Sequence, residues 1–270
     1  MTTKTAIRRD YGGTLRFKGK IAIVTGGGTG IGKAVAEALV SEGARVVLNG
    51  RREDVLRAAA TSIDATGNLV MYISGDISQP PIAGAVVEAA TQQFGGVDLL
   101  FNNAGIFAPK PFLDHTEDDY DRFLGTILKG KFFMAQAAAK AMKARGGGVI
   151  VQTGSMWALQ AVGATPSSAY SAANAGVHQM VKNLAIELAP AKIRVNAVAP
   201  AVVKTPVYST FLPPDQVDAA LASFNSFHPL GRIGQPADLV PSMLFLASDD
   251  ASWITGVVLP VDGGVMAGRA

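Results

Sequence analysis

The sequence has no cysteine and only three histidines, and these scarcities exclude several kinds of chemistry. Without cysteine the chain has no disulfide, no thiol nucleophile and no thiolate ligand for a metal ion. His115, His178 and His228 lie far apart and do not have the spacing of metal ligands. We therefore expect no resident metal.

Charge is sparse as well. Charged residues make up 17% of the chain, and the net charge is +3, with lysines and arginines scattered along the sequence. Scattered charge of this kind argues against nucleic acid as a partner. A long uncharged stretch, 146–181, is interrupted by glycine, proline and polar side chains, so it is unsuited to spanning a membrane. Residues 1–20 lack the apolar segment of a signal peptide, and we expect a cytoplasmic protein with no membrane partner.

What the sequence does contain is a regular alternation of apolar runs and helix-length segments from Lys20 onward. The runs are almost continuously hydrophobic, as in parallel strands covered on both faces. Strands alternating with helices predict an α/β fold, a single doubly wound Rossmann-type domain with a parallel sheet of about seven strands. The expected strands are Ile21–Thr25, Arg45–Asn49, Leu69–Ser74, Val97–Phe101, Val149–Thr153, Arg194–Val198 and Val257–Val261. The expected helices span residues 31–42, 53–65, 81–94, 117–144, 168–188 and 236–247.

This domain is expected to occupy residues 18–270, after a flexible N-terminal extension of residues 1–17. One long connection, 200–234, breaks the alternation and contains several aromatic residues and prolines. A long apolar loop after the carboxyl end of a strand predicts a substrate lid. The alternative interpretation is a packed surface helix or an oligomer contact.

The segment between the first strand and the first helix, TGGGTGIG, has the composition of a phosphate-binding turn. Its glycines let the backbone turn tightly and approach a ligand without interference from Cβ atoms. The helix that follows directs its free N–H groups and its positive dipole end toward the same place. We therefore predict a pyrophosphate site with contacts from Gly26, Gly28, Thr29, Gly30 and Ile31.

The end of the second strand predicts which dinucleotide binds there. A carboxylate at this position binds a ribose 2′-hydroxyl in NAD-dependent proteins. This chain has Asn49 and Gly50 instead, followed by Arg51 and Arg52. Two guanidinium groups without a nearby carboxylate favour a 2′-phosphate. The prediction is NADP rather than NAD, unless Arg52 only begins the next helix in solvent.

Several motifs, in the same order along the chain, resemble the classical short-chain dehydrogenase/reductase family over Lys18 to Met266. They are TGGGTGIG (25–32), SGDIS with Asp76, NNAG (102–105), VIVQTGSM with Ser155, AYSAAN with Tyr170, RVNAVAPAVVKTP (194–206) and VDGG (261–264).

The resemblance implies an oxidoreductase that moves a hydride between a nicotinamide and a carbonyl or alcohol carbon. Such a reaction needs an acid/base for the substrate oxygen and a hydroxyl that holds this oxygen. The resemblance assigns these roles to Tyr170 and Ser155, with Asn174 beside them. It also implies that the cofactor contacts Asp76, Ile77, Asn103, Ala104, Gly105, Tyr170, Asn174, Pro200, Val203 and Thr205.

Two positions depart from the family's set of Asn, Ser, Tyr and Lys. Asn174 stands where the lysine belongs, four residues after Tyr170, and Ile127 stands in TILKG where asparagine belongs. Tyrosine has a pKa of about 10, and a nearby cation typically lowers the pKa of an acid by about 1–3 units. Asn174 can bind the nicotinamide ribose but brings no charge.

Three sources could supply the missing charge or proton path. The oxidised nicotinamide is itself positive. His178 lies two helical turns after Tyr170 on the same face, where it can join a relay or pack in an interface. Lys131, four residues after Ile127, lies on the inner side of its helix and can reach toward the site.

Three functions are therefore open. The first is an NADP-dependent reductase or dehydrogenase with a modified proton relay. The second is a lyase or isomerase on the same fold without net redox chemistry. The third is a catalytically weak NADP-binding sensor or partner subunit. For the first, the expected substrate is a small hydrophobic carbonyl or alcohol, because apolar side chains dominate the expected pocket: Met156, Trp157, Leu159, Val162, Tyr208, Phe211 and Phe224.

The resemblance also implies a homotetramer, with a dimer as the alternative. The helices expected at 117–144 and 168–188 are rich in small residues, which permits close packing between subunits. The apolar closing segment from Trp253 to Met266 is a candidate for a second contact. In the alternative interpretation these faces belong to the core of one subunit.

Overall fold

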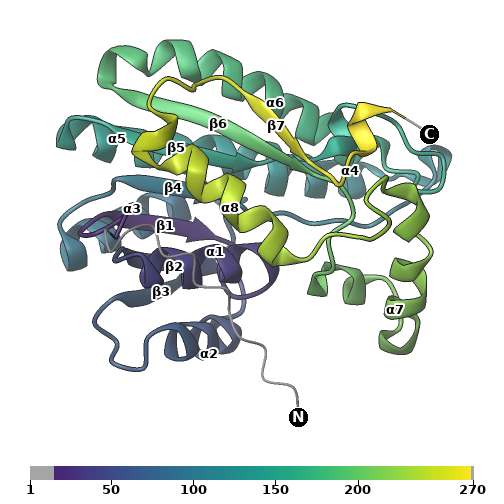
Figure 1. Ribbon diagram of the computed structural model, residues 1–270, viewed down its shortest axis with the longest axis horizontal. Helices are drawn as coiled ribbons and strands as arrows, with labels where there is room; N and C mark the ends of the chain where they lie inside the picture. The colour runs from purple at the N-terminus through teal and green to yellow at the C-terminus, as the bar shows by residue number, and fades with distance from the viewer. Residues whose placement is uncertain (1–14, 269–270) are drawn as a thin grey trace.

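Seven parallel strands form one sheet in the order β3-β2-β1-β4-β5-β6-β7 in the computed structural model, which describes residues 15–268. The strands alternate with helices along the chain (Figure 1), as the apolar runs of the sequence predict. Their bounds are β1 Ile21–Thr25, β2 Arg45–Gly50, β3 Val70–Ser74, β4 Leu99–Asn102, β5 Gly148–Thr153, β6 Ile193–Pro200 and β7 Val258–Val261.

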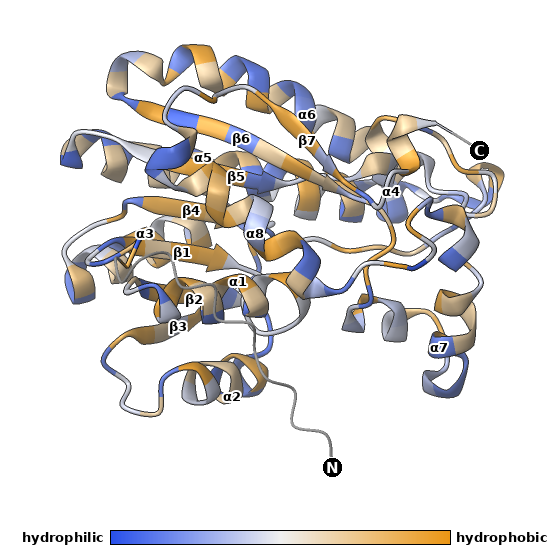
Figure 2. Ribbon diagram, viewed as in Figure 1, coloured by the Kyte–Doolittle hydropathy of each residue, from blue (hydrophilic) through white to orange (hydrophobic). Residues whose placement is uncertain are grey.

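Helices cover both faces of this sheet. One face is packed by α1 (Gly30–Ser41), α2 (Glu53–Ile63) and α8 (Pro236–Ala247). The other face is packed by α3 (Pro80–Phe94), α5 (Gly130–Arg145) and α6 (Ser168–Glu187). Because every strand is sandwiched between two layers, the strand residues are apolar on both sides, and Figure 2 shows the central strands mostly in orange.

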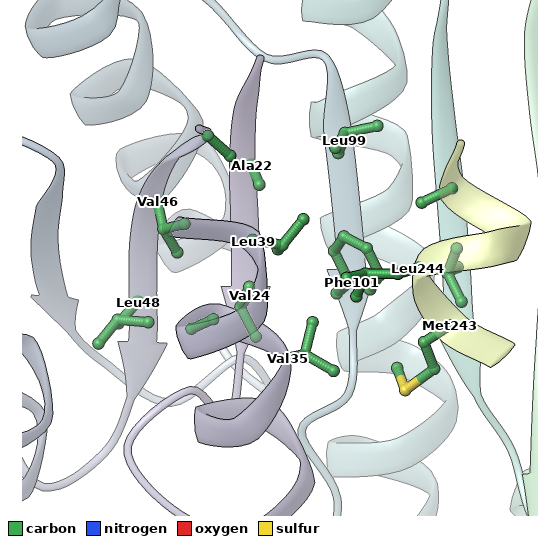
Figure 3. Packing of buried hydrophobic residues seen from close by; sticks show 14 of the residues in the cluster. Ala22, Val24, Val35, Leu39, Val46, Leu48, Leu99, Phe101, Met243 and Leu244 are labelled. Atoms are coloured by element: carbon green, nitrogen blue, oxygen red, sulfur yellow. The ribbon is translucent and has the colours of Figure 1, made fainter. Parts of the chain in front are cut away.

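Successive side chains of each strand point to opposite faces of the sheet, and the core beneath α1 and α8 contains every second strand residue. Figure 3 shows alternate residues of β1, β2 and β4 pointing toward side chains of α1 and α8. The residues between them, such as Ile23, Val47 and Leu100, point to the opposite face and join the core under α3, α5 and α6. The sheet is therefore held by two separate apolar layers.

The strand order reverses direction at β1. From β1 the chain adds β2 and β3 on one side, and then crosses over to add β4, β5, β6 and β7 on the other. The helices after β1 and β4 consequently leave on opposite faces, and a crevice opens between them at the carboxyl ends of the strands. This edge of the sheet is where the predicted site residues gather.

The prediction of one continuous helix over residues 117–144 is wrong. Residues 117–144 were expected to form a single helix, but the structure has α4 (Glu117–Phe123), a π-helical segment (Leu124–Lys129) and then α5. A π-helix has wider turns than an α-helix and is often found at functional sites. The hydrophobic period of the sequence does not reveal such a widened turn, because the apolar positions on either side remain helical.

The connection 200–234 is also more ordered than an open loop. It contains a short 3-10 turn (Pro206–Thr210), helix α7 (Pro214–Ala222) and a second 3-10 turn (Asn225–Phe227). In Figure 1, α7 lies at the right of the view, away from the helices that cover the sheet. Leu221 of α7 is buried, and both interpretations of this connection, a substrate lid and a packed helix or oligomer contact, stay predictions.

The boundary of the domain lies earlier than residue 18. Phe17 was assigned to the extension, but its side chain is 1% exposed and belongs to the core beneath α1. Residues 1–14 of the predicted extension lie outside the described residues. Within residues 15–268, no helix combines the length and hydrophobicity needed to cross a membrane.

Candidate active site

Side-chain hydrogen bonds tie the carboxyl ends of β1, β4 and β5 together. The Thr25 hydroxyl donates to Asn102 Oδ1 at 3.2 Å and accepts from the Ala104 amide at 3.0 Å. Asn103 Nδ2 donates to the Thr25 carbonyl at 3.2 Å, and the Thr153 hydroxyl donates to Asn103 Oδ1 at 3.2 Å. This network fixes the edge of the sheet on which a ligand would lie.

The glycine turn after β1 is packed too closely to accept side chains. Gly26 has φ of +65°, and a Cβ there would lie 3.0 Å from Asn103 Nδ2. At Gly32 a Cβ would lie 2.3 Å from the Gly26 carbonyl oxygen. Thr29 precedes α1 and makes no capping bond with its side chain, so the amino end of α1 is not capped by it. A turn with this cradle and an uncapped helix end fits the pyrophosphate of a dinucleotide.

A cleft of about 160 Å³ runs along this turn. It brings together residues from four separate predicted segments, and its lining includes Gly26, Gly28, Thr29, Arg51, Arg52, Asp76, Ile77, Ala104 and Gly105. Thr126 and Ile106 also line the cleft, and the sequence analysis missed both. Thr126 reaches it from the π-helical segment, which no sequence pattern had shown.

The remaining cofactor residues of the prediction lie outside this cleft. Thr205 packs against Gly30, where an added Cβ would lie 3.2 Å from Thr205 Cβ. Val203 is buried and forms an isolated bridge with Gly234, and Pro200 ends β6. The side chains of Ile31 and Asn103 serve the fold, through apolar packing and through the strand-end network.

The end of β2 has the charge that the sequence predicted. Asn49 is buried, and its Nδ2 donates to the carbonyls of Ile73 at 3.0 Å and Gly75 at 3.3 Å. Its Oδ1 has no partner among the described residues. Arg51 and Arg52 are exposed at the rim of the cleft, and neither forms an ion pair within residues 15–268. Two guanidinium groups are thus available to an anion.

The two hydroxyls predicted to carry the chemistry meet at the ends of β5 and α6. Ser155 is 2% exposed, and its Oγ accepts from the Trp157 amide at 3.2 Å, which caps the short turn after β5. Burial raises the pKa of Tyr170, while hydrogen bonding to Ser155 and Asn174 acts in the opposite direction. The pKa of the phenol is raised overall, so Tyr170 is protonated at neutral pH and can donate its proton as a general acid.

Asn174 lies one helical turn after Tyr170 and is 2% exposed. Its Nδ2 donates to the carbonyl oxygen of Tyr170 at 3.0 Å, a bond within α6. The side chain of Asn174 is therefore a neutral amide that is engaged with its own helix, and its correspondence to the family lysine stays a prediction.

Ile127 is buried in the π-helical segment and 1% exposed. Its side chain belongs to an apolar cluster between this segment and α6, whose buried members are Ile106, Phe123, Ile127, Ala169, Ala173, Val177 and Met180. Ile127 thus contributes packing and no polar group, and its correspondence to the family asparagine stays a prediction.

Two basic residues are buried close to this pair of hydroxyls. The Ser155 amide donates to His178 Nε2 at 3.3 Å, so His178 carries its proton on Nδ1. Lys131 is 2% exposed, and its Nζ donates to the carbonyl of Thr153, two residues before Ser155. The structure therefore brings Lys131 and His178 together behind Ser155.

Aromatic rings surround the phenol of Tyr170. Phe107, which the sequence analysis did not single out, has its ring centroid 4.9 Å from that of Tyr170 in an edge-to-face arrangement. The same ring lies 6.2 Å from Trp157, 6.4 Å from Tyr208 and 5.7 Å from Phe211. Phe107 follows the NNAGI segment at the end of β4, and its place after a strand's carboxyl end was the available signal.

Comparison with known proteins agrees with this arrangement. Residues 26–266 match the family model described as enoyl-(acyl carrier protein) reductase. The chain is 39% identical over 251 residues to the L-rhamnose 1-dehydrogenase (NAD(P)(+)) of Azotobacter vinelandii, covering 91% of this chain and 96% of that protein. It is 37% identical over 256 residues to the 3alpha-hydroxysteroid dehydrogenase of Mediterraneibacter gnavus, covering 92% and 98%.

A solved structure extends the similarity to three dimensions. The short-chain type dehydrogenase/reductase from Mycobacterium marinum matches with a TM-score of 0.88 at 35% identity, covering 94% of this chain and 98% of that one. The chain belongs to the short-chain dehydrogenase/reductase family, a family of oxidoreductases. The resemblance drawn from the motifs is confirmed at this level.

Proposed function

We propose that this protein is an NADP(H)-dependent oxidoreductase that interconverts a carbonyl and an alcohol on a small hydrophobic substrate. The observation that carries the proposal is the meeting of Tyr170 and Ser155 at the sheet edge that also forms the nucleotide cleft. When bound, the nicotinamide supplies or accepts the hydride.

The chain's own residues handle the substrate oxygen. Ser155 donates a hydrogen bond to this oxygen and polarises the carbonyl, and Tyr170 gives it a proton during reduction. In the reverse direction, the Tyr170 phenolate accepts the proton of the alcohol. The ring of Phe107 excludes water from the phenol on one side.

The cleft supports a dinucleotide with a 2′-phosphate. The Gly26 turn and the amino end of α1 suit the pyrophosphate, and Asp76 and Ile77, which line the same cleft, are the proposed contacts to the adenine. Arg51 and Arg52 are free to hold the 2′-phosphate, since charge-assisted bonds from guanidinium groups match phosphate geometry. Asn174, Pro200, Val203 and Thr205 are the proposed contacts toward the nicotinamide end.

The pocket beside Tyr170 supports a hydrophobic substrate. Its rings come from Phe107, Trp157, Tyr208 and Phe211, and rings of this kind favour flat apolar groups. One relative is named for a sugar and another for a steroid, so family membership alone does not select a substrate class. The aromatic lining favours the steroid-like end of this range.

The test is turnover with NADPH and a panel of ketones, diketones and quinones, followed by the absorbance of the reduced nicotinamide. The proposal expects turnover that Tyr170→Phe abolishes. Tyr120→Phe is the matched control, because Tyr120 lies on α4 with 49% exposure and should leave the rate unchanged. Turnover that persists in Tyr170→Phe would remove the phenol from the mechanism.

One observation favours a second candidate, a catalytically weak NADP-binding sensor or partner subunit. Two of the four residues of the family's active site are replaced, by Asn174 and by the buried Ile127. Tight NADPH binding without turnover on any carbonyl would support this second function. Conversion of a substrate without any change in nicotinamide absorbance would instead point to a lyase or isomerase.

We also propose that the protein is a homotetramer. A largely apolar groove of about 1090 Å³ lies between α5 and α6, with Phe132 43% exposed at its edge, and a second copy of these two helices suits it. Trp253, 99% exposed before β7, marks a second contact. Light scattering should show a dimer for Phe132→Glu or Trp253→Glu alone and a monomer for both together. Leu113→Glu, at a residue 92% exposed elsewhere, should remain tetrameric.

A further inference from the structure

A buried polar corner lies directly behind Ser155. Along β5, Ile150 points into the core under α5 and α6, so Gln152 and Gly154, two and four residues later, face the same helices. His178 occupies the space over Gly154, where an added Cβ would lie 2.1 Å from His178 Nε2. Lys131 enters the same corner from α5, three residues before Met134 of this core.

Hydrogen bonding places Lys131 firmly at this corner. Asn102, the β4 neighbour of Gln152 in the sheet, donates from Nδ2 to the backbone carbonyl of Lys131 at 2.8 Å. The ammonium group itself donates to the carbonyl of Thr153 at the end of β5. Lys131 is therefore anchored at both ends, next to the strand that delivers Ser155.

The buried polar groups of this corner reduce the stability of the fold. Both amide atoms of Gln152 and Nδ1 of His178 are buried without a partner among the described residues. Lys131 has no carboxylate partner within residues 15–268, since none of the ion pairs there includes it. Buried lysines are rare unless paired, and a fold keeps such unfavourable groups mainly at functional sites.

The two titratable side chains that meet at the corner, Lys131 and His178, are both bases. Burial lowers the pKa of the Lys131 ammonium to about 7. Burial, and then the charges of Lys131 and Lys182, lower the pKa of His178 to about 4, so this imidazole is neutral at neutral pH. On α6, Tyr170 and the exposed Lys182 are the other titratable groups near His178, and β4 and β5 contribute the uncharged Asn102 and Gln152.

We propose that Lys131 supplies, from α5, the positive charge that position 174 lacks, and that it acts on the reaction from behind Ser155. The inference rests on the proposed oxidoreductase function. During reduction, the proton of Tyr170 passes to the substrate oxygen and leaves a phenolate, while the carbonyl oxygen carries negative charge before it is protonated. A buried cation at the end of β5, two residues before Ser155, lowers the energy of this negative charge, because the interior screens it poorly.

Lys131 is thus a positioning residue, and it does not touch the substrate. It fixes the end of β5 through the Thr153 carbonyl and exerts its charge through the Ser155 side of the site. His178 completes the corner by holding the Ser155 amide with a neutral ring. Because the ammonium loses its proton near neutral pH, the reductase rate should fall as pH rises through this range.

The test compares the pH profile of NADPH-dependent carbonyl reduction in the wild type and in two neutral variants, Lys131→Met and Lys131→Gln. Below pH of about 7 both variants should be at least tenfold slower, consistent with a charge effect of about one pKa unit. They should also lose the decline of the rate above this pH. Lys182→Met is the matched control, because Lys182 also acts on His178 but is exposed on α6, and it should keep the wild-type profile.

Rescue separates charge from packing. Asn174→Lys added to Lys131→Met should restore the rate at least tenfold, because it returns a cation to the same site. A parallel measurement of thermal stability should show Lys131→Met to be more stable than the wild type although slower, which a merely structural lysine would not produce.

The inference and the proposed function fail in different ways. If Tyr170→Phe abolishes turnover but both Lys131 variants keep the wild-type rate and profile, only the role of Lys131 is wrong. If turnover survives Tyr170→Phe, the proposed mechanism is wrong. Absence of turnover in the wild type with every carbonyl overturns both.

Discussion

The amide of Asn174 donates to the carbonyl oxygen of Tyr170 at 3.0 Å, inside a single turn of α6. The side chain at position 174 is thereby directed back along its own helix, and the phenol of Tyr170 receives no charge from it. Burial raises the pKa of this phenol, and no adjacent cation on α6 offsets the effect. This relationship makes position 174 the most informative one to change.

Asn174→Lys should make alcohol oxidation faster and move its optimum to lower pH. A lysine one turn from Tyr170 favours the phenolate, and an adjacent cation typically lowers an acid's pKa by about 1–3 units. The measurement is the pH dependence of NADP⁺-dependent alcohol oxidation. An unchanged rate together with an unchanged optimum would mean that position 174 does not face the reacting oxygen.

Gly32→Ala should weaken both the fold and cofactor binding, because a Cβ there would lie 2.3 Å from the Gly26 carbonyl oxygen. The matched control is Gly84→Ala in α3, where nothing lies within 4 Å of an added Cβ. The control should stabilise the protein by about 0.5–1 kcal/mol through helix propensity. Urea unfolding of both variants tests whether the first loses stability and the second gains it, and NADPH titration tests whether only the first binds the cofactor more weakly.

Arg51→Ala should raise the dissociation constant for NADPH and leave that for NADH unchanged. Hydrogen bonds to charged groups contribute about 1.5–3 kcal/mol, which corresponds to roughly a tenfold to hundredfold loss. Arg57→Ala is the control, since Arg57 on α2 pairs with Glu53 at 2.8 Å and does not line the cleft. Equal losses for both cofactors would assign Arg51 to general attraction of the pyrophosphate.

Stability should rise with pH because of Lys131. Its pKa is about 7 in the folded protein and 10.5 in an unperturbed lysine, so the unfolded chain binds more protons between these two values. The free energy of unfolding therefore increases as pH rises from about 7 to about 10.5. Lys131→Met should lose this slope and be the more stable protein below pH 7. Thermal unfolding of both proteins across this pH range measures the difference. If the stability of the wild type and of Lys131→Met changed with pH in the same way, Lys131 would be exposed to solvent.

Much of the fold follows from local sequence signals. Continuous apolar runs such as Ile21–Thr25 specify buried parallel strands, and helix α8 begins and ends where the sequence predicted. The cleft residues were also accessible, since glycines after one strand and arginines after the next converge at a common edge of a parallel sheet. These features depend on neighbours in sequence and on one topological rule.

Other features depend on contacts that no local pattern encodes. The widened turn at 124–129 brings Thr126 to the cleft, and Phe107 reaches Tyr170 from the far side of the pocket. Burial of Lys131 was only one of several possibilities in the sequence, because a lysine beside a helix's inner face usually extends to water. Its confinement results from the packing of α5 onto β5 and of α6 onto the neighbouring β6.

The hydrogen bonds that join Thr25, Asn103 and Thr153 involve none of the groups that handle the substrate oxygen. The frame of the site and its reactive groups are therefore carried by different residues and can be altered independently. A substitution at 174 or 127 leaves the hydrogen bonds of this platform in place. A charge missing from one helix can therefore be supplied by a neighbouring helix without rebuilding the frame.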